Sequence, residues 1–546
     1  MPSDPPNYSR AEVAAFAVGV GVVGIGALLF TGRFAYCIYD DAYIYFRYAR
    51  HVVEGCGLAF NCPGPPVEGF TSPAYLGLLS AAGLLTDDFE TISQALGYVF
   101  TLIGLSLTLL LPLHPRWNLS STGRLAVPVA CAVVFALDDY LLVHAVTGME
   151  VPLTWAVAAG FGIAAIADDH RALKALAVLG PLVRPEFALF SVGLLVFPVA
   201  RRARYWLPIV AAGAGVVLVR WWIFGTLLPN TFWVKTGGTP HHLSMGLGYL
   251  AEALVDFPWV LLAPLAFAAR RPRRGMAYLA VASTAWVAHV VWVGGDFYAG
   301  SRYLAPLVPL MTVLGLTGLY RVAERVAPAV GVGRQRAGVV LLAAVVIPVG
   351  LHLGLTVTRN INSRSFTNSV RLWRLTGEHI REHFPEASVA TAAIGAIGYY
   401  SRAEIVDLVG LTDPRIGRYG RRAPKRAFSI GHNTYDTEVV LREQPDVVAL
   451  RTATRGPWSP ERPVQTGIFA EHDLVRTLKA RDAPYVAYSP KLAGQVHGLL
   501  LVRRSLADQI EAAQRYPVDR VDVELTEPAD PSPKIRWLLR LLGLPH

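Results

Sequence analysis

The sequence predicts a polytopic α-helical membrane protein of about eleven spans with a C-terminal extracytoplasmic α/β domain. Hydrophobic residues make up 53% of the 546 residues and charged residues only 16%, a balance unlike that of a soluble globular protein. Between residues 11 and 358, apolar runs recur, most of them long enough to cross a hydrocarbon layer of about 30 Å. After residue 359 charged residues become more frequent, and segments with the length and composition of strands appear.

Short basic loops separate the apolar runs and carry much of the net charge of +10. We interpret them as cytoplasmic, because Lys and Arg are enriched on that side of a membrane, and not as a nucleic-acid-binding surface. Because the basic loops all lie on the same side, the chain must cross the membrane an even number of times between one basic loop and the next. The loops that separate them therefore face outward, and we refer to this argument as parity. The N-terminal tail, residues 1–10, is then cytoplasmic. The basic loops contain Arg116 with Arg124, His170 to Lys174, Arg201 to Arg204, Arg270 to Arg274 and Arg321 to Arg336.

The transmembrane module, residues 11–358, is expected to include a long first external loop at residues 31–86. Helix connections typically have roughly 2–8 residues, and much longer loops commonly carry function. Parity excludes the apolar stretch from Thr71 to Thr86 as a full crossing, so we expect a juxtamembrane or re-entrant helix there. Cys56 and Cys62 flank a short turn in this loop. They either form a disulfide in an oxidising compartment or remain two unpaired small residues.

Residues 359–526 are predicted to form the extracytoplasmic α/β domain, in which strands alternate with helices. Strands are expected at Ser388–Ala393, Pro445–Leu450 and His497–Val502, and a helix at Ser369–Phe384. Residues 527–546 then give a Pro-rich linker and a short cationic amphipathic helix suited to a lipid surface.

The segment DDAYIYFRYARHVVEGCGLAFN, which begins at Asp40 and Asp41, carries the strongest local signal for chemistry. Two adjacent carboxylates at the mouth of a membrane span are costly near lipid, so they need water, a cation or a partner. In one interpretation either aspartate caps an interfacial helix whose tyrosines lie at headgroup level. In the other, one aspartate is a general base whose pKa is raised by partial desolvation. Spacing alone does not separate the two interpretations.

Polar side chains on other external loops are placed by parity at the same membrane face as Asp40 and Asp41. A cationic pair such as Lys235 and Arg302 beside carboxylates suits a site that holds an anionic phosphate and activates a hydroxyl. For each residue, a role as a cap, a turn or an ion pair is the alternative, and we favour Asp40, Asp41 and Arg302 as functional. The set comprises Glu68, Glu150, Arg184, Glu186, Asn230, Lys235, Asp296 and Arg302.

Several motifs are absent from the sequence, which has no Walker A loop, no GxGxxG before a helix, no HExxH and no CxxC pair. Their absence argues against ATP-driven transport. His241 and His242 lie in one loop without nearby ligands, so no metal site is assigned to them. A divalent cation as a cofactor is left open, and no nucleic-acid partner is expected.

Seven segments between Asp40 and Arg418 follow one another in a specific order. They are DDAYIYFRYARHVVEGCGLAFN, VEGFTSPAYLGLL, TGMEVPL, LVRPE, FGTLLPNTFWVKT, GGDFYAGSRYLAPLVP and GAIGYYSRAEIVDLVGLTDPRIGR. In this order they resemble the bacterial lipid-phosphosugar-dependent glycosyltransferases of the GT-C fold, and most closely the terminal β-(1→2) arabinofuranosyltransferase group. The likeness departs from the family at EGCGLAFNCPGPP, where relatives usually have a plain turn, and at Phe187, where they often have Gly.

The resemblance implies an inverting enzyme of the bacterial inner (plasma) membrane. Such an enzyme takes a sugar from a polyprenyl-phosphate donor and adds it to an extracytoplasmic cell-envelope glycan, lipid or protein. In the family, the acidic motif of the first external loop supplies the catalytic base, which here falls on Asp40 or Asp41. Arabinofuranose is one candidate sugar, because family members differ in the sugar they use. We assign binding of the donor phosphate or substrate to Arg302, Lys235, Asn230, Glu150, Asp296, Arg184 and Glu68.

Two other classes of function are considered. A transporter for lipid-linked glycans would place ionisable residues at mid-bilayer depth and broken helices in corresponding halves. Here the charges gather at one face and no halves repeat. A non-catalytic assembly protein would tolerate replacement of the carboxylates in the first external loop.

Overall fold

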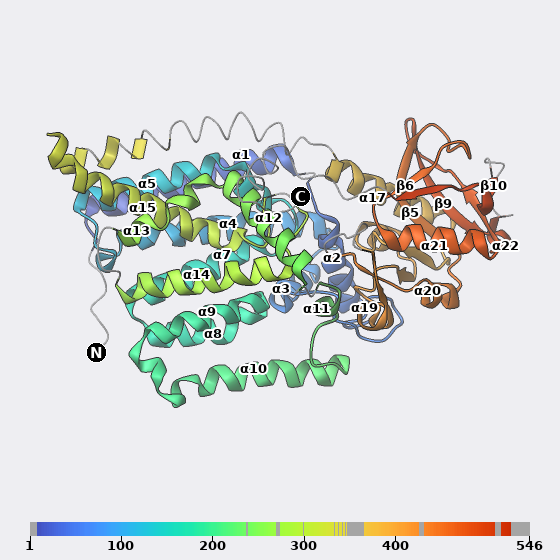
Figure 1. Ribbon diagram of the computed structural model, residues 1–546, viewed down its shortest axis with the longest axis horizontal. Helices are drawn as coiled ribbons and strands as arrows, with labels where there is room; N and C mark the ends of the chain where they lie inside the picture. Colours follow the sequence, from blue (N-terminus) through green and yellow to red (C-terminus); the bar gives the residue numbers. More distant parts are fainter. Residues whose placement is uncertain are drawn as a thin grey trace.

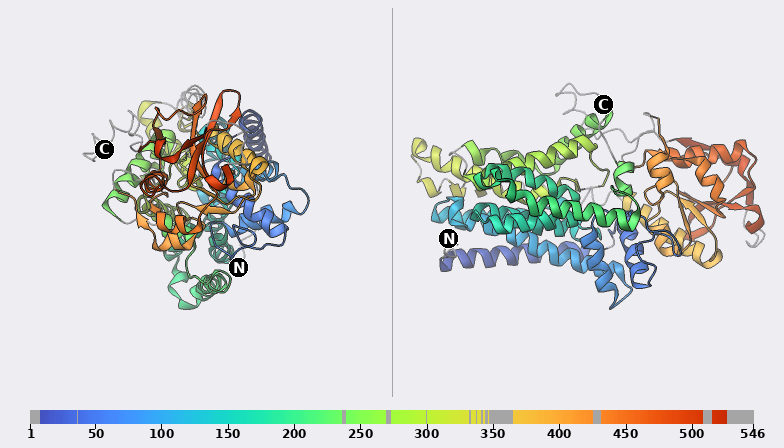
Figure 2. Two further views of the ribbon diagram at one scale, coloured as in Figure 1. Left: turned by 90° about the vertical axis from the view of Figure 1, so that its right-hand side faces the viewer. Right: turned by 90° about the horizontal axis from the view of Figure 1, so that it is seen from below.

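The computed structural model describes residues 8–35, 37–235, 239–268, 273–298, 300–331, 365–424, 431–507 and 515–525, together with parts of 333–346. Long helices run side by side in a bundle, and a sheet-containing C-terminal domain lies at one end of it (Figure 1). Figure 2 shows the same arrangement from two further sides, with the C-terminal domain in front of the bundle in the left-hand view. The expected N-terminal tail lies mostly outside the described residues, and so does the expected linker and helix at residues 527–546.

The bundle contains five described helices that are long and apolar enough to cross a membrane, or seven if two bent pairs each count as one span. Two shorter apolar helices, Val151–Ala167 and Pro185–Val196, accompany them. The count of about eleven spans stays a prediction, and an apolar run at residues 337–356 lies largely outside the described residues. The helices of the bundle are α1 (Arg10–Phe34), α4 (Phe89–Leu113), α5 (Ser121–Leu137), α6 (Asp139–Leu142), α7 (Val151–Ala167), α8 (His170–Val183), α9 (Phe190–Gly193), α10 (Ala203–Phe224), α12 (Pro240–Asp256), α13 (Leu265–Ala268), α14 (Arg274–Val293) and α15 (Val308–Val326).

The chain bends sharply after α12, where it turns by 96° before the segment Pro258–Phe267. Pro258 explains the break, because proline has no backbone N–H and disfavours the helical conformation of the residue before it. Phe257 accordingly has φ −125° and ψ 64°. The helix α12 therefore does not continue as one straight crossing.

Small residues allow the helices of the bundle to approach closely. At Gly104 of α4, an added Cβ would lie 2.6 Å from the Cβ of Trp155 in α7. At Gly97, it would lie 2.2 Å from the carbonyl oxygen of Ala145. Close contact through glycine is the usual means by which membrane helices pack, since burial of apolar surface gives little driving force within lipid.

The long loop at residues 31–86 contains two helices, α2 (Asp40–Val53) and α3 (Pro73–Gly83). The expectation of a non-spanning helix in the apolar stretch is confirmed, because α3 has 11 residues and is too short to cross. The interfacial interpretation of α2 is wrong. Tyr45 and Tyr48 are 3% and 0% exposed, because α2 packs between α3 and helix α18 (Ala396–Ser401) of the C-terminal domain.

The disulfide alternative for the two cysteines of this loop is the one that the structure contains. Cys56 and Cys62 are bonded, with their Cα atoms 5.9 Å apart. The closed turn includes Phe60 and Asn61, whose oxygen atoms both accept hydrogen bonds from Arg47. The disulfide therefore constrains the backbone on which Arg47 is anchored.

The C-terminal domain is built on a mixed sheet with strand order β10-β7-β9-β5-β1-β2, and β8 pairs with β9. Strand β1 is parallel to β2 and β5, whereas β9 is antiparallel to β5 and β7. The predicted strands are confirmed as β1, β5 and β9, and the predicted helix is α17. The domain contains α17 (Ser365–His383), β1 (Val389–Thr391), β2 (Ile405–Asp407), α19 (Pro414–Tyr419), β3 (Arg421–Arg422), β4 (Thr434–Tyr435), α20 (Thr437–Glu443), β5 (Val447–Arg455), β6 (Val464–Thr466), α21 (Phe469–Ala480), β7 (Tyr485–Tyr488), β8 (Lys491–Ala493), β9 (Val496–Arg503), α22 (Arg504–Ala507), β10 (Arg515–Pro517) and β11 (Val523–Leu525).

Arg47 of α2 joins the loop at residues 31–86 to the C-terminal domain. Its side chain is buried, and it donates to the carbonyl oxygens of Gly398 and Ala403, the latter at 2.8 Å. Asn61 extends the same contact, since it donates to and accepts from the backbone of Ile405, both at 2.9 Å. Because buried donors without partners are costly, these bonds fix α2 against the domain.

Candidate active site

The main cavity has a volume of about 560 Å³ and lies where the bundle meets the C-terminal domain. Its walls come from α2, α10, α14, the short helix α11 (Asn230–Lys235) and the loop before α15, with further residues from the C-terminal domain. Side chains with acid–base or charged groups line it at Asp40, Asp41, Arg184, Glu186, Arg220, Lys235, His289, Asp296, Arg302, Tyr303, Asp407 and His432.

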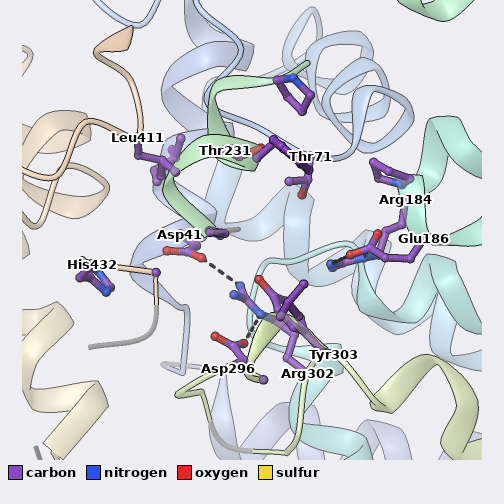
Figure 3. A pocket seen from close by; sticks show the side chains of 18 of the residues that line it. Asp41, Thr71, Arg184, Glu186, Thr231, Asp296, Arg302, Tyr303, Leu411 and His432 are labelled. Atoms are coloured by element: carbon purple, nitrogen blue, oxygen red, sulfur yellow. Dashed lines mark hydrogen bonds and ion pairs between the residues drawn. The ribbon is translucent and has the colours of Figure 1, made fainter. Parts of the chain in front are cut away.

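Arg302 bridges two carboxylates at one side of the main cavity (Figure 3). Its Nη1 lies 3.0 Å from Oδ2 of Asp41, and its Nε lies 2.6 Å from Oδ2 of Asp296. Tyr298 donates its hydroxyl to the other oxygen of Asp41 at 3.1 Å. Burial alone would raise the pKa of Asp41, but the charges of Arg302 and Lys235 lower it to about 2. Asp41 is therefore ionised and held in place at neutral pH.

Two glycines form the turn that places Asp296 beside Arg302. Gly294 and Gly295 have φ angles of +94° and +83°, which residues with a Cβ rarely adopt. A Cβ on Gly295 would also lie 2.4 Å from the ring of Tyr249. The GGD sequence is thus required by a tight turn at the end of α14.

Asp40 has a different environment from its neighbour. It is 8% exposed, and its Oδ1 accepts a hydrogen bond of 2.7 Å from the backbone N–H of Ala396 in the C-terminal domain. Burial raises the pKa of Asp40 to about 7, although the Ala396 N–H acts in the opposite direction. The capping interpretation is wrong for both aspartates, because the N-cap position of α2 is Tyr39 and this helix end has no side-chain capping hydrogen bond. Two adjacent carboxylates thus have pKa values on opposite sides of the usual range.

Lys235 differs from the arginines of the main cavity. Arg184, Arg220 and Arg302 all form ion pairs with carboxylates, whereas no described carboxylate lies within 4.0 Å of the Lys235 amine. Burial would lower the pKa of Lys235, but Tyr303 and Asp41 raise it above its usual value. Lys235 is therefore a protonated amine available to an anionic ligand.

Three of the residues assigned to substrate binding do not line the main cavity within the described part of the chain. Glu68 pairs with Arg220 at 2.5 Å, and Glu150 pairs with Arg184 at 2.6 Å, so both serve as partners that hold arginines. Asn230 donates to two backbone carbonyls of the C-terminal domain. The other assigned residues, Arg302, Lys235, Asp296 and Arg184, do meet there with Asp40 and Asp41, as parity predicted.

Several residues in or beside the main cavity were missed by the sequence analysis. Tyr303 and Tyr298 lie beside Arg302, and their position in GGDFYAGSRY was a usable signal. Asp407 and His432 come from the C-terminal domain, far from the first-loop aspartates in the chain. Asp407 lies in the last of the seven ordered segments, where no role was assigned to it, and no local pattern marked His432. Among the described residues, no group of three or more His, Cys, Asp and Glu side chains is placed to hold a metal ion.

Comparison with solved structures defines the class of fold. The chain superposes on ArnT from Cupriavidus metallidurans in the apo state with a TM-score of 0.52 and 14% identity, over 90% of this chain and 98% of that chain. For the same protein bound to undecaprenyl phosphate the TM-score is 0.51 with 13% identity, over 92% and 98%. The helical GT-C fold implied by the family resemblance is confirmed, and the comparison shows that it is ArnT-like.

A particular relative is found at the level of sequence. The chain is 30% identical over 330 residues to the terminal β-(1→2)-arabinofuranosyltransferase of Mycobacterium tuberculosis. The match covers 51% of this chain and 52% of the relative, so the chain spans about half the length of the curated relative it matches. Residues 360–492 match a family described as a domain of unknown function (DUF8728).

Proposed function

We propose that the protein is an inverting glycosyltransferase that moves a sugar from a polyprenyl-phosphate donor to a cell-envelope acceptor. One observation carries this proposal: Asp40 and Asp41 share one cavity with Lys235, which has no ion-pair partner among the described residues. The activity in the name of the mycobacterial relative and the undecaprenyl phosphate bound to ArnT support it. The name of this relative makes arabinofuranose the donor sugar that we propose first.

The donor phosphate is proposed to bind at Lys235. A protonated amine forms strong charge-assisted hydrogen bonds with phosphate, and Arg302 adds a guanidinium whose charge is shared with Asp41 and Asp296. The apolar tail of the donor fits the apolar wall, where Leu189, Leu228 and Trp292 line the main cavity. Leu228 and Trp292 are 38% and 52% exposed, so this wall continues onto a surface that lipid can cover.

The transfer step is a single displacement. A hydroxyl of the acceptor attacks the anomeric carbon, the new C–O bond forms, and the bond between that carbon and the phosphate oxygen breaks. Asp40 accepts the hydroxyl proton, because its pKa of about 7 lies close to the working pH, where general bases act most effectively. Lys235 stabilises the negative charge on the departing polyprenyl phosphate. Asp41 keeps Arg302 oriented and remains ionised.

A reconstitution assay tests the proposed function. Purified protein would be incubated with arabinan oligosaccharides as acceptor and one donor at a time. The donors, tested in separate reactions, are polyprenyl-phosphate arabinofuranose, mannose and glucose. Mass spectrometry should show addition of one sugar from one of these donors, together with release of polyprenyl phosphate. Donor consumption without product would indicate hydrolysis. Movement of intact donor across vesicles without any transfer would instead favour the transporter alternative.

Replacing Lys235 by Met should raise the KM for the polyprenyl-phosphate donor by about 10–100-fold. The variant loses a hydrogen bond between charged groups, which typically contributes about 1.5–3 kcal/mol. Steady-state kinetics against donor concentration measures the change. Lys491→Met, on an exposed strand position, is the matched control and should leave the KM unchanged. An unaltered donor KM in Lys235→Met would contradict the assignment.

The active site and the C-terminal domain are proposed to face the extracytoplasmic side. The Cys56–Cys62 disulfide supports this orientation, because structural disulfides persist in oxidising compartments. In intact cells, a membrane-impermeant maleimide should label Cys56 and Cys62 only after treatment with an impermeant reductant. A Cys37→Ser, Cys131→Ser background removes the other cysteines. Labelling that requires permeabilised cells would place the loop in the cytoplasm.

A further inference from the structure

The two sides of α11 contact different parts of the molecule. Thr231 and Lys235 are four residues apart, so they share one face of the helix, and both line the main cavity. Asn230 and Val234 share the neighbouring face. Val234 is 1% exposed and belongs to the hydrophobic core of the C-terminal domain, although it lies between two helices of the bundle in sequence. The C-terminal domain, as much as the bundle, therefore determines where α11 lies.

Asn230 makes the polar contact on that face. It is 5% exposed, and its Nδ2 donates to the carbonyl oxygens of Gly410 and Leu411 at 2.7 and 2.8 Å. Both acceptors belong to the loop after β2. One amide group thus holds two consecutive carbonyls, which fixes both the distance and the rotation of α11 relative to that loop.

The acceptor loop is itself preorganised by Asp407. This carboxylate is 2% exposed and accepts backbone N–H groups from Val409, Gly410 and Thr412 at 2.9, 3.0 and 2.7 Å. Asp407 thus fixes the backbone of this loop, whose Gly410 and Leu411 carbonyls accept from Asn230. Asp407 and Leu411 also line the main cavity.

Close packing leaves little room for α11 to shift. A Cβ on Gly417 of α19 would lie 2.3 Å from the carbonyl oxygen of Gly410 and 3.1 Å from the amide of Asn230. On the exposed side, Arg422 donates to the carbonyl oxygen of Trp233 at 2.9 Å. The backbone of α11 is therefore held from two directions by the C-terminal domain.

We propose that Asn230 is a positioning residue, which fixes α11 to the loop at residues 409–412 of the C-terminal domain and thereby sets Lys235 in place for the donor phosphate. This inference rests on the proposed function and replaces the assignment of Asn230 to substrate binding. It makes the C-terminal domain part of the phosphate site, although none of the amines or guanidinium groups proposed to bind the phosphate belongs to that domain. Misplacement by about 1 Å can lower a rate by as much as about 100-fold.

A double-mutant cycle with Lys235 tests the proposal. Asn230→Asp keeps the shape of the side chain but places a carboxylate oxygen opposite two carbonyl oxygens, and Asn230→Ala removes the amide. Both should lower kcat/KM for the polyprenyl-phosphate donor by about 10–30-fold, within the range expected for misplaced groups. In a Lys235→Met background, either change should lower kcat/KM by less than about twofold, because the group that Asn230 positions is already absent.

Binding of undecaprenyl phosphate alone gives a readout that does not depend on catalysis. Asn230→Ala and Lys235→Met should each weaken it, and the double variant should bind no more weakly than Lys235→Met. Asn230→Ser, which can donate to one carbonyl, should recover part of the loss and serves where Asn230→Ala does not fold. Gln465→Ala, at an exposed strand position, is the matched control and should bind normally.

The outcomes separate the inference from the function on which it rests. If the wild type neither transfers sugar nor binds undecaprenyl phosphate, the proposed function fails. If Lys235→Met is impaired but Asn230→Ala is not, only the inference fails. Full additivity of the two changes would show that Asn230 acts independently of Lys235, through substrate contact or general stability, and would also overturn the inference.

Discussion

Asp40→Asn should lower the rate of sugar transfer by about 10²–10⁴-fold, the usual contribution of a general base. The amide keeps the shape of the side chain and leaves Lys235 in place, so binding of undecaprenyl phosphate should change by less than about twofold. Initial rates and equilibrium binding on the same purified preparation would measure both quantities. Retention of most activity in Asp40→Asn would remove the proposed base.

The pH dependence distinguishes Asp40 from Asp41. The pKa of Asp40 is raised to about 7, so it is protonated and inactive as a base at low pH, and the wild-type rate should rise with pH through about 7. Asp41→Asn removes a neighbouring negative charge that helps to raise the pKa of Asp40. Its residual activity should therefore have a midpoint at lower pH. A base with the Asp41 pKa of about 2 would give a rate with no such midpoint near neutrality.

Arg302→Met should abolish detectable transfer and destabilise the protein by about 3–5 kcal/mol, because it leaves the buried carboxylate of Asp296 without its partner. Arg302 is 3% exposed, and it forms ion pairs with both Asp41 and Asp296. Thermal unfolding and transfer assays would detect the two effects. Arg302→Lys retains the charge but not the two-pronged geometry, so it should recover stability more than activity.

Arg302→Met should also change how the stability of the protein responds to acid. In the wild type, the pKa of Asp41 is lowered to about 2, whereas an aspartate in the unfolded chain has a pKa of about 4. The Asp41–Arg302 ion pair therefore contributes fully to stability above pH about 4, and this contribution is lost as the pH falls toward 2. Arg302→Met should lack this acid-sensitive contribution. Arg481→Met, in an exposed ion pair of the C-terminal domain, should resemble the wild type. Equal acid sensitivity in Arg302→Met and the wild type would contradict the proposed role of the ion pair.

Much of the site could be predicted because membrane topology restricts which loops can meet. Counting basic loops was enough to place Asp41, Lys235, Asp296 and Arg302 at one end of the bundle, and the structure brings them into one cavity. Topology gives the face of a side chain but not its partner. Glu68 and Glu150 were therefore assigned to the substrate, whereas each is engaged by an arginine of the bundle.

The contribution of the C-terminal domain could not be predicted in this way. Its strands were recognisable from composition, but the contacts of Ala396 with Asp40 and of Gly410 with Asn230 join residues far apart in the chain. Local patterns carry no information about such pairs. The tyrosines of α2 show the same limit, because a pattern typical of a membrane interface is buried here by a domain that folds over it.

A structure of the Asp40→Asn variant with a bound polyprenyl-phosphate sugar would test the central claim most directly. The account predicts a phosphate oxygen about 3 Å from the Lys235 amine, at hydrogen-bond distance, with the anomeric carbon between that phosphate and residue 40. The lipid tail of the bound donor should leave the main cavity past Leu228 and Trp292. A phosphate bound outside the main cavity, or a sugar on the far side of the phosphate from residue 40, would contradict the account.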